Sequence, residues 1–265
     1  MEIDLLRQMQ DFVDDVHCQG FALIKNVFPV VMIDDILYEF KEMEHHFIDI
    51  QKKKGIYSKV IGATHHTPLL CRKMLTLLEP SKLTLFLDCF FCGQKYILNT
   101  MGLSKIEPSG SVYTQKIHRD VRSFPGATDL WINTLIMLND SKPDNGATWI
   151  YSGSHKNVHK PTEEEFWSHA MQVEGKKGDV LVFHGGIWHC AGQNTSKETR
   201  HIITPFFSRP FIKQQLDYPR AFGDEFAQIC SSHLRQLLGY NSRVPSTLLE
   251  FYQEDEERFY KTDQG

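Results

Sequence analysis

The chain has 265 residues, of which 41% are hydrophobic and 23% are charged, a size and composition typical of one globular domain with a substantial core. Its net charge of -4 provides no basic surface for nucleic acid, so we expect no nucleic-acid partner. The chain starts without a basic segment followed by an apolar core, and no apolar run approaches the ~18 residues that a membrane span needs. We therefore predict a cytoplasmic protein without membrane association.

The first third of the chain is predicted to be largely helical. A short, β-favouring apolar stretch at Phe21–Val27 interrupts it, and residues 49–67 are rich in lysine and broken by glycine, which predicts a solvated loop or a mobile lid. Apolar residues recur elsewhere at helical spacing. These patterns predict helices over about residues 3–17, from Pro29 onward, and over residues 68–78 and 83–92.

From residue 96 the pattern changes to short β-like runs separated by Gly, Pro, Asn and Asp. Eight strands are predicted, at residues 96–106, 111–117, 130–138, 148–151, 171–173, 179–183, 188–193 and 200–208. Eight such strands fit a double-stranded β-helix, a jelly roll of the cupin kind. We predict a mainly β fold with flanking helices in a single domain, which divides into an N-terminal helical layer (1–94), a jelly-roll core (about 95–210) and a C-terminal helical tail (211–265).

Metal-binding residues are predicted within this core. His118 and Asp120 point the same way on an extended segment, because side chains on a strand repeat with period two. A distant histidine would complete the facial triad that suits non-heme Fe(II) and leaves positions open for a co-substrate and oxygen. His189 is the leading candidate, and His184, on the other side of the Gly185-Gly186 turn, is its rival. Arg200 further along can hold a dicarboxylate through a forked contact.

The order of these motifs resembles the phytanoyl-CoA dioxygenase family of Fe(II)/2-oxoglutarate oxygenases. The resemblance runs from near Gly20-Phe21 to about Pro210. In the family pattern the metal-binding histidine stands eleven residues before the co-substrate arginine, which favours His189 over His184. The residues that carry the resemblance are Gln115-x-x-His118-Arg119-Asp120, Asp144-Asn145-Gly146-Ala147-Thr148, Ser152-Gly153-Ser154-His155, and Gly178-Asp179 leading to His189 and Arg200.

The resemblance implies a set of cofactors and a reaction. Iron, 2-oxoglutarate and O2 are expected, with ascorbate as a supporting reductant, and 2-oxoglutarate is converted to succinate and CO2 while a C–H bond of a small metabolite is oxidised. The outcome can be hydroxylation, desaturation, cyclisation or epoxidation, and the oligomeric state is left open. The implied residues are His118, Asp120 and His189 for iron, Arg200 for the co-substrate carboxylate, Gln115 and Thr148 as hydrogen-bonding partners of the co-substrate, and Trp131 at its border.

One position departs from the family pattern. Several relatives carry a serine two residues after the distal histidine, where this chain has Ala191, so we expect one co-substrate contact to be lost or to be supplied by Thr148 or Thr204. Several polar and basic residues lie close in sequence to the metal-binding segments and permit a polar or anionic substrate. They are Arg72, Lys116, Arg119, Arg122 and Asn133.

Two other interpretations use the same residues. A cupin-like protein would hold a metal or ligand without oxygenase activity, and it would not convert 2-oxoglutarate to succinate. A protein hydroxylase of the JmjC type shares the metal pair but generally anchors the keto acid by a lysine on an inner strand. Arg200 argues against this second alternative.

Overall fold

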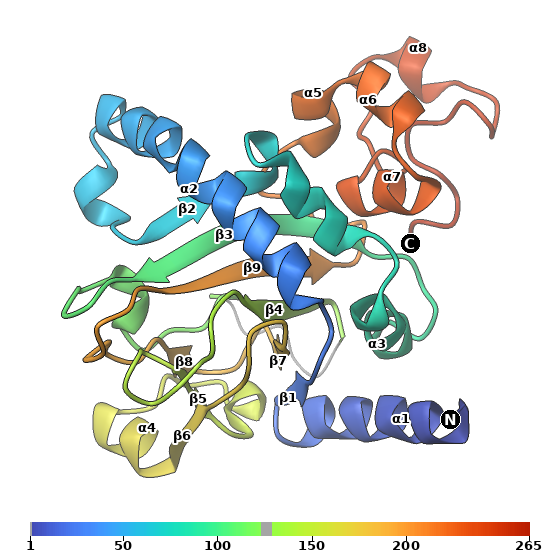
Figure 1. Ribbon diagram of the computed structural model, residues 1–265. Helices are drawn as coiled ribbons and strands as arrows, with labels where there is room; N and C mark the ends of the chain where they lie inside the picture. Colours follow the sequence, from blue (N-terminus) through green and yellow to red (C-terminus); the bar gives the residue numbers. More distant parts are fainter. Residues whose placement is uncertain (1, 123–128) are drawn as a thin grey trace.

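Two antiparallel sheets face each other in the computed structural model, which describes residues 2–122 and 129–265 (Figure 1). The larger sheet contains, in spatial order, β1 (Phe21–Ile24), β7 (Val180–His184), β4 (Trp131–Met137), β9 (Arg200–Ser208), β3 (Ile97–Ile106) and β2 (Ala63–His65). The smaller sheet contains β6 (Ala170–Val173), β5 (Thr148–Tyr151) and β8 (His189–Cys190). The predicted mainly β, jelly-roll fold with flanking helices is confirmed.

Three helices cover the outer face of the larger sheet: α1 (Glu2–Cys18), α2 (Val30–Lys53) and α3 (Lys82–Phe90). Their apolar side chains recur every three or four residues, so each helix has one buried stripe. In α2 this stripe consists of Ile33, Ile36, Leu37, Phe40 and Phe47. The stripes pack against Ile132 and Ile136 of β4 and Val182 of β7 in one apolar core, whose burial stabilises the sheet.

The inner face of the larger sheet packs on the smaller sheet. Leu135 of β4 and Leu181 and Phe183 of β7 join Ile150 and Val173 of the smaller sheet in a second core. Alternate residues of a strand therefore enter different cores, as the two-residue period of a strand requires. The same alternation turns the first residue of β9 and every second residue after it toward the space between the sheets.

The N-terminal segment departs from the prediction in two places. Helix α2 extends to Lys53, because its apolar stripe continues to Phe47, so the predicted loop at 49–67 begins inside a helix and also contains a 3-10 turn (Tyr57–Lys59) and strand β2. The predicted helix at 68–78 is replaced by 3-10 segments at Thr67–Leu69 and Arg72–Leu78. The segment predicted as a helical layer thus also supplies both edge strands of the larger sheet.

The predicted strand at 111–117 is wrong. This segment folds into a 3-10 turn (Tyr113–Gln115), because the Gln115 side-chain oxygen accepts a hydrogen bond from the Val112 backbone N–H at 3.1 Å. Helix α4 (Glu163–His169) was not predicted, and it starts where the Thr162 hydroxyl accepts the Glu165 N–H. The other seven predicted strands are present, with the one at 188–193 reduced to β8.

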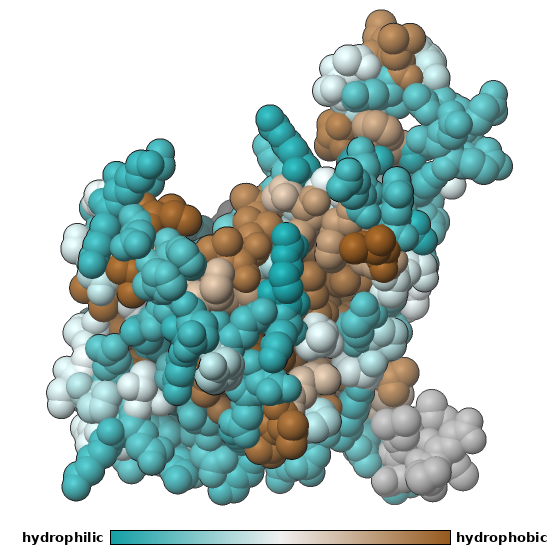
Figure 2. Space-filling view, turned by 45° about the horizontal axis from the view of Figure 1, so that its top comes forward, coloured by the Kyte–Doolittle hydropathy of each residue, from teal (hydrophilic) through white to brown (hydrophobic). Residues whose placement is uncertain are grey.

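The tail after residue 217 is helical, as predicted. It comprises α5 (Tyr218–Phe222), α6 (Asp224–Ile229), α7 (Ser232–Leu238) and α8 (Leu248–Phe251). Helix α7 is anchored by buried leucines at 234, 237 and 238, whereas Figure 2 shows the far end of this region projecting from the body with a hydrophobic tip. No helix within the described residues combines the length and apolar character needed to cross a membrane.

Candidate active site

His118 and His189 face each other across an isolated antiparallel bridge. The backbone N–H of His118 donates to the His189 carbonyl at 3.0 Å, and the His189 N–H donates to the His118 carbonyl at 2.9 Å. The two imidazole centroids are 4.3 Å apart. These reciprocal hydrogen bonds hold two side chains from distant parts of the sequence in register on one wall between the sheets.

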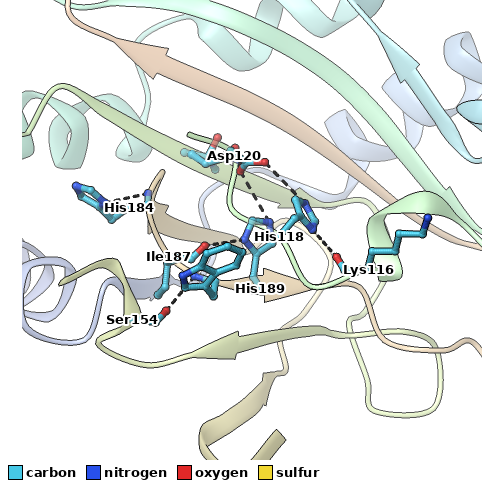
Figure 3. A network of polar contacts seen from close by, with 11 residues as sticks. Lys116, His118, Asp120, Ser154, His184, Ile187 and His189 are labelled. Carbon is cyan, nitrogen blue, oxygen red and sulfur yellow. Dashed lines mark hydrogen bonds and ion pairs between the residues drawn. The ribbon is translucent and has the colours of Figure 1, made fainter. Parts of the chain in front are cut away.

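Asp120 completes this cluster. Its Oδ1 lies 3.8 Å from His118 Nε2, and its Oδ2 lies 3.8 Å from His189 Nε2. One ligand atom from each residue lies within 4.8 Å of the others, and Figure 3 shows the three side chains pointing toward one another. Among the residues the structure describes, no other group of three His, Cys, Asp or Glu side chains has this spacing. Two imidazoles and one carboxylate suit a non-heme iron ion.

Both imidazole rings are oriented through their Nδ1 atoms. His118 Nδ1 donates to the Lys116 carbonyl at 2.7 Å, and His189 Nδ1 donates to the Ile187 carbonyl at 3.1 Å (Figure 3). These bonds favour the tautomer whose Nε2 carries a lone pair toward the cluster. Burial, together with the neighbouring His118, lowers the pKa of His189, so its ring is neutral and able to bind a metal at neutral pH.

Asn133 on β4 orients the carboxylate. Its Nδ2 donates to Asp120 Oδ2, while its Oδ1 accepts the Thr134 backbone N–H at 2.8 Å. The second bond sets which end of the buried amide faces Asp120. The sequence had suggested a substrate-facing role for Asn133, and the structure adds this contact with the carboxylate. A polar residue on the otherwise apolar inward face of a strand is the feature that can identify such a partner from sequence.

Arg200 begins β9 and is 2% exposed. Its Nη1 donates to the Gly146 carbonyl at 2.8 Å, whereas its Nε has no hydrogen-bond partner in the described part of the chain. Burial lowers its pKa to about 10, so the guanidinium stays charged at neutral pH. No carboxylate among residues 7–122 and 129–265 forms an ion pair with it. A buried cation with unused donors fits a carboxylate ligand.

The Asn145-Gly146 turn presents the carbonyl that Arg200 uses. Gly146 has a φ of +92°, and a Cβ there would lie 3.0 Å from the Gly192 carbonyl oxygen, so this position favours glycine. The Asn145 side chain closes the same turn through the Lys142 N–H and the Asp140 carbonyl. The acidic, glycine-containing motif found in the sequence therefore positions the Arg200 guanidinium through the Gly146 carbonyl.

A cavity of about 600 Å³ opens at the three-residue cluster. Thr148, Ala191 and Thr204 line it, as expected for residues near a co-substrate. Gln115, Trp131 and Arg200 are absent from the part of its wall that the structure describes. The Gln115 amide bonds the Val112 N–H and the Gly192 carbonyl. Contact of any of these three residues with a co-substrate therefore stays a prediction.

Two further histidines lie outside the cluster. His184 is turned away from it in Figure 3 and accepts the Gly186 N–H through Nδ1 at 3.0 Å. His201 follows Arg200 on β9, so it faces the opposite side of the sheet, where its Nδ1 lies 3.2 Å from Asn139 Oδ1. The structure thus separates both from the three residues expected to bind iron.

The predicted basic residues divide into two groups. Lys116, Arg119 and Arg122 line the cavity, and Lys160, which lies far from them in the sequence, joins them. Arg72 does not belong with them, because its guanidinium packs 4.4 Å from the Phe222 ring centroid in the C-terminal helices. Because this contact joins residues far apart in the sequence, the sequence position of Arg72 did not indicate where its side chain lies.

Comparisons with known proteins find relatives over most of the chain. Residues 16–202 match the family model described as phytanoyl-CoA dioxygenase. An uncharacterized protein of Mycobacterium tuberculosis is 28% identical over 95% of this chain and 94% of its own length. The dioxygenase cdmA of Talaromyces verruculosus is 34% identical, over 91% of this chain and 83% of its own. The solved structure of the epimerase SnoN with Fe3+, alpha ketoglutarate and nogalamycin RO has a TM-score of 0.61 at 16% identity, over 77% of this chain and 84% of SnoN.

Proposed function

Because this chain belongs to the phytanoyl-CoA dioxygenase family, we propose that it is an Fe(II)/2-oxoglutarate-dependent oxygenase that acts on a small molecule. One arrangement carries the proposal: His118, Asp120 and His189 present three ligand atoms within 4.8 Å, and the same inner face carries the buried guanidinium of Arg200. The first feature suits iron and the second suits a dicarboxylate. The relative cdmA is a dioxygenase, and SnoN holds iron and alpha ketoglutarate, which supports this pairing.

In this proposal His118, Asp120 and His189 hold the metal and leave coordination positions for the keto acid and oxygen. The bound iron supplies the redox chemistry that couples conversion of 2-oxoglutarate to succinate and CO2 with oxidation of the substrate by O2, and ascorbate supports it. Residues of the chain bind and orient the co-substrate. Arg200 pairs with the distal carboxylate of 2-oxoglutarate, and Thr148, which is 3% exposed on the cavity wall, hydrogen-bonds the co-substrate.

The reaction we propose is oxidation of an unactivated C–H bond, with hydroxylation as the expected outcome. Asp120 supports this outcome over halogenation, because a carboxylate at this position occupies the place that a halide would need on the metal. SnoN, which shares the fold, is an epimerase. The product formed from a given substrate therefore decides between hydroxylation and other oxidative outcomes.

Metal content and co-substrate binding test the proposal together. Purified protein with Fe(II) should bind 2-oxoglutarate, develop the visible charge-transfer band of the chelate, and release succinate when substrates are screened. His118→Ala and His189→Ala should lose bound iron and the band. His184→Asn is the matched control, because an asparagine oxygen can replace Nδ1 as the acceptor for Gly186 N–H, and it should keep both.

Two results would contradict the proposal. Iron-loaded protein that never binds 2-oxoglutarate would instead favour a cupin-like binding protein. Loss of iron in His184→Asn with retention in His189→Ala would show that the ligand assignment is wrong.

A further inference from the structure

Four cations surround the cavity of the proposed iron site. Lys116, Arg119, Arg122 and Lys160 contribute to its wall, and Asp120 is the only acidic residue in the part of the wall that the structure describes. The whole chain has the opposite balance, with 33 acidic and 29 basic residues. The carboxylate of Asp120 is also committed to the metal cluster, so the remaining charge on the wall is positive.

Three of these four cations are not neutralised by a carboxylate in the described part of the chain. Lys116, Arg122 and Lys160 form no ion pair with an acidic side chain among residues 7–122 and 129–265. Arg119 is partly buried and held in place, because its guanidinium lies 5.2 Å from the Trp188 ring centroid and its Nη2 donates to the Arg122 carbonyl at 3.0 Å. A fixed guanidinium loses less side-chain entropy when it binds an anion.

The co-substrate does not account for these charges. The distal carboxylate of 2-oxoglutarate is assigned to Arg200, which is fully buried and bonded to Gly146 rather than lining the open cavity. Lys116, Arg122 and Lys160 are exposed instead, at the solvent side of the cavity. Like charges lining a cleft raise the local concentration of the opposite ion and speed its capture.

Four buried apolar side chains belong to the cavity wall, beside hydroxyl and amide side chains of the same strands. They are Leu103 of β3, Leu135 of β4, and Ile202 and Phe206 of β9. A volume of about 600 Å³ is ample for a small organic ligand, since such sites span roughly 300–1,000 Å³ and combine apolar walls with a few polar groups. A molecule that complements both the apolar side chains and the cations of this wall has an apolar body and an anionic end.

We propose that the substrate is an amphiphilic organic anion whose carboxylate, sulfonate or phosphate group is held by Arg119, Arg122, Lys116 and Lys160 while its apolar body lies against the inner face of the larger sheet. This inference rests on the proposed function, because it assigns the cavity to the substrate of that reaction. The charged end stays near solvent and the apolar body reaches the metal cluster.

Two dyes of matched shape test the proposal. The probe 8-anilinonaphthalene-1-sulfonate is an amphiphilic anion, and N-phenyl-1-naphthylamine has nearly the same body without the charge. Binding of each is measured by fluorescence titration to the iron-loaded protein, to Arg122→Glu/Lys160→Glu, and to Lys156→Glu/Lys197→Glu. The last variant makes the same change of net charge at two exposed lysines that do not line the cavity.

The sulfonate dye should bind the Arg122→Glu/Lys160→Glu variant about tenfold or more weakly, because two attractions become repulsions, and added salt should weaken its binding to the unmodified protein. The neutral dye should bind all three proteins alike. The proposal is overturned if the sulfonate dye does not distinguish the two variants, or if both dyes weaken together. Succinate release is then measured with pairs of compounds, each a carboxylic acid or phosphate ester and its neutral amide or alcohol. The pairs show which anionic group the substrate carries.

The same samples separate this inference from the proposed function. The 2-oxoglutarate band depends on the iron ligands and Arg200, so it should persist in both double variants. A protein that lacks the band in every form refutes the proposed function. A protein that keeps the band but treats charged and neutral dyes alike refutes only the anionic substrate.

Discussion

Replacing Asn133 with leucine should weaken metal binding without unfolding the site. The Asn133 amide is 7% exposed and donates to Asp120 Oδ2, and leucine has a similar volume but no donor. A hydrogen bond to a charged group contributes roughly 1.5–3 kcal/mol, which corresponds to about a 10- to 100-fold change in affinity. Loss of a hydrogen-bonding partner of a metal ligand typically has an effect of this size.

The measurement is the dissociation constant of Mn(II), a redox-stable stand-in for Fe(II), by isothermal titration calorimetry. Thr134→Val is the matched control, because Thr134 is the next residue on β4, is fully buried, and donates its hydroxyl to the Pro205 carbonyl at 2.7 Å on the other side of the strand. Both variants should lose some stability. Only Asn133→Leu should lose metal affinity, and equal affinities in the two variants would refute the argument.

Three further predictions follow from the site and its surroundings. Arg200→Lys should leave iron binding unchanged but weaken 2-oxoglutarate by roughly 2 kcal/mol, because a forked contact is lost; an unchanged titration of the visible band would contradict this. Ala191→Ser, on the cavity wall, should tighten 2-oxoglutarate by about two- to tenfold through one added hydrogen bond, and no gain would mean that another side chain already fills that role. Burial, reinforced by the charges of Lys41 and Lys105, lowers the pKa of His201 to about 4. Between about pH 4 and 6.5, His201 is therefore protonated in the unfolded chain and neutral in the folded one. Stability should therefore fall as the pH drops from about 6.5 toward 4, by up to about 3 kcal/mol from this residue. Urea unfolding at several pH values should show a shallower loss for His201→Asn, and parallel curves would refute the assignment.

The alternation of inward and outward side chains along the strands could be predicted from the sequence, because each face of a strand packs against a single core. The positions of β4 and β9 followed from that pattern, and so did the opposite directions of Arg200 and His201. His118 and Asp120 were expected to converge because they would lie on a strand, yet only His118 makes a bridge and a 3-10 turn precedes it. The expected residues came together, although the local structure that brings them together differs.

Contacts made by single side chains across long sequence separations could not be predicted in the same way. The Gln115 side chain donates to the Gly192 carbonyl, 77 residues further along the chain, and the Arg72 guanidinium packs against the Phe222 ring instead of lining the cavity. Lys160 reaches the cavity from the loop before α4. Hydrophobic period does not encode such contacts, because each depends on where two separate elements finally meet.

The reciprocal backbone bonds between His118 and His189 also make the site observable without iron. These two amides are donors in the bridge itself, so their exchange with deuterated solvent requires the bridge to open. If the folded chain holds the bridge on its own, both amides should exchange slowly in metal-free protein, and iron should slow them little further. The site would then be assembled by folding, and its affinity for metal would not include the free energy of ordering the chain.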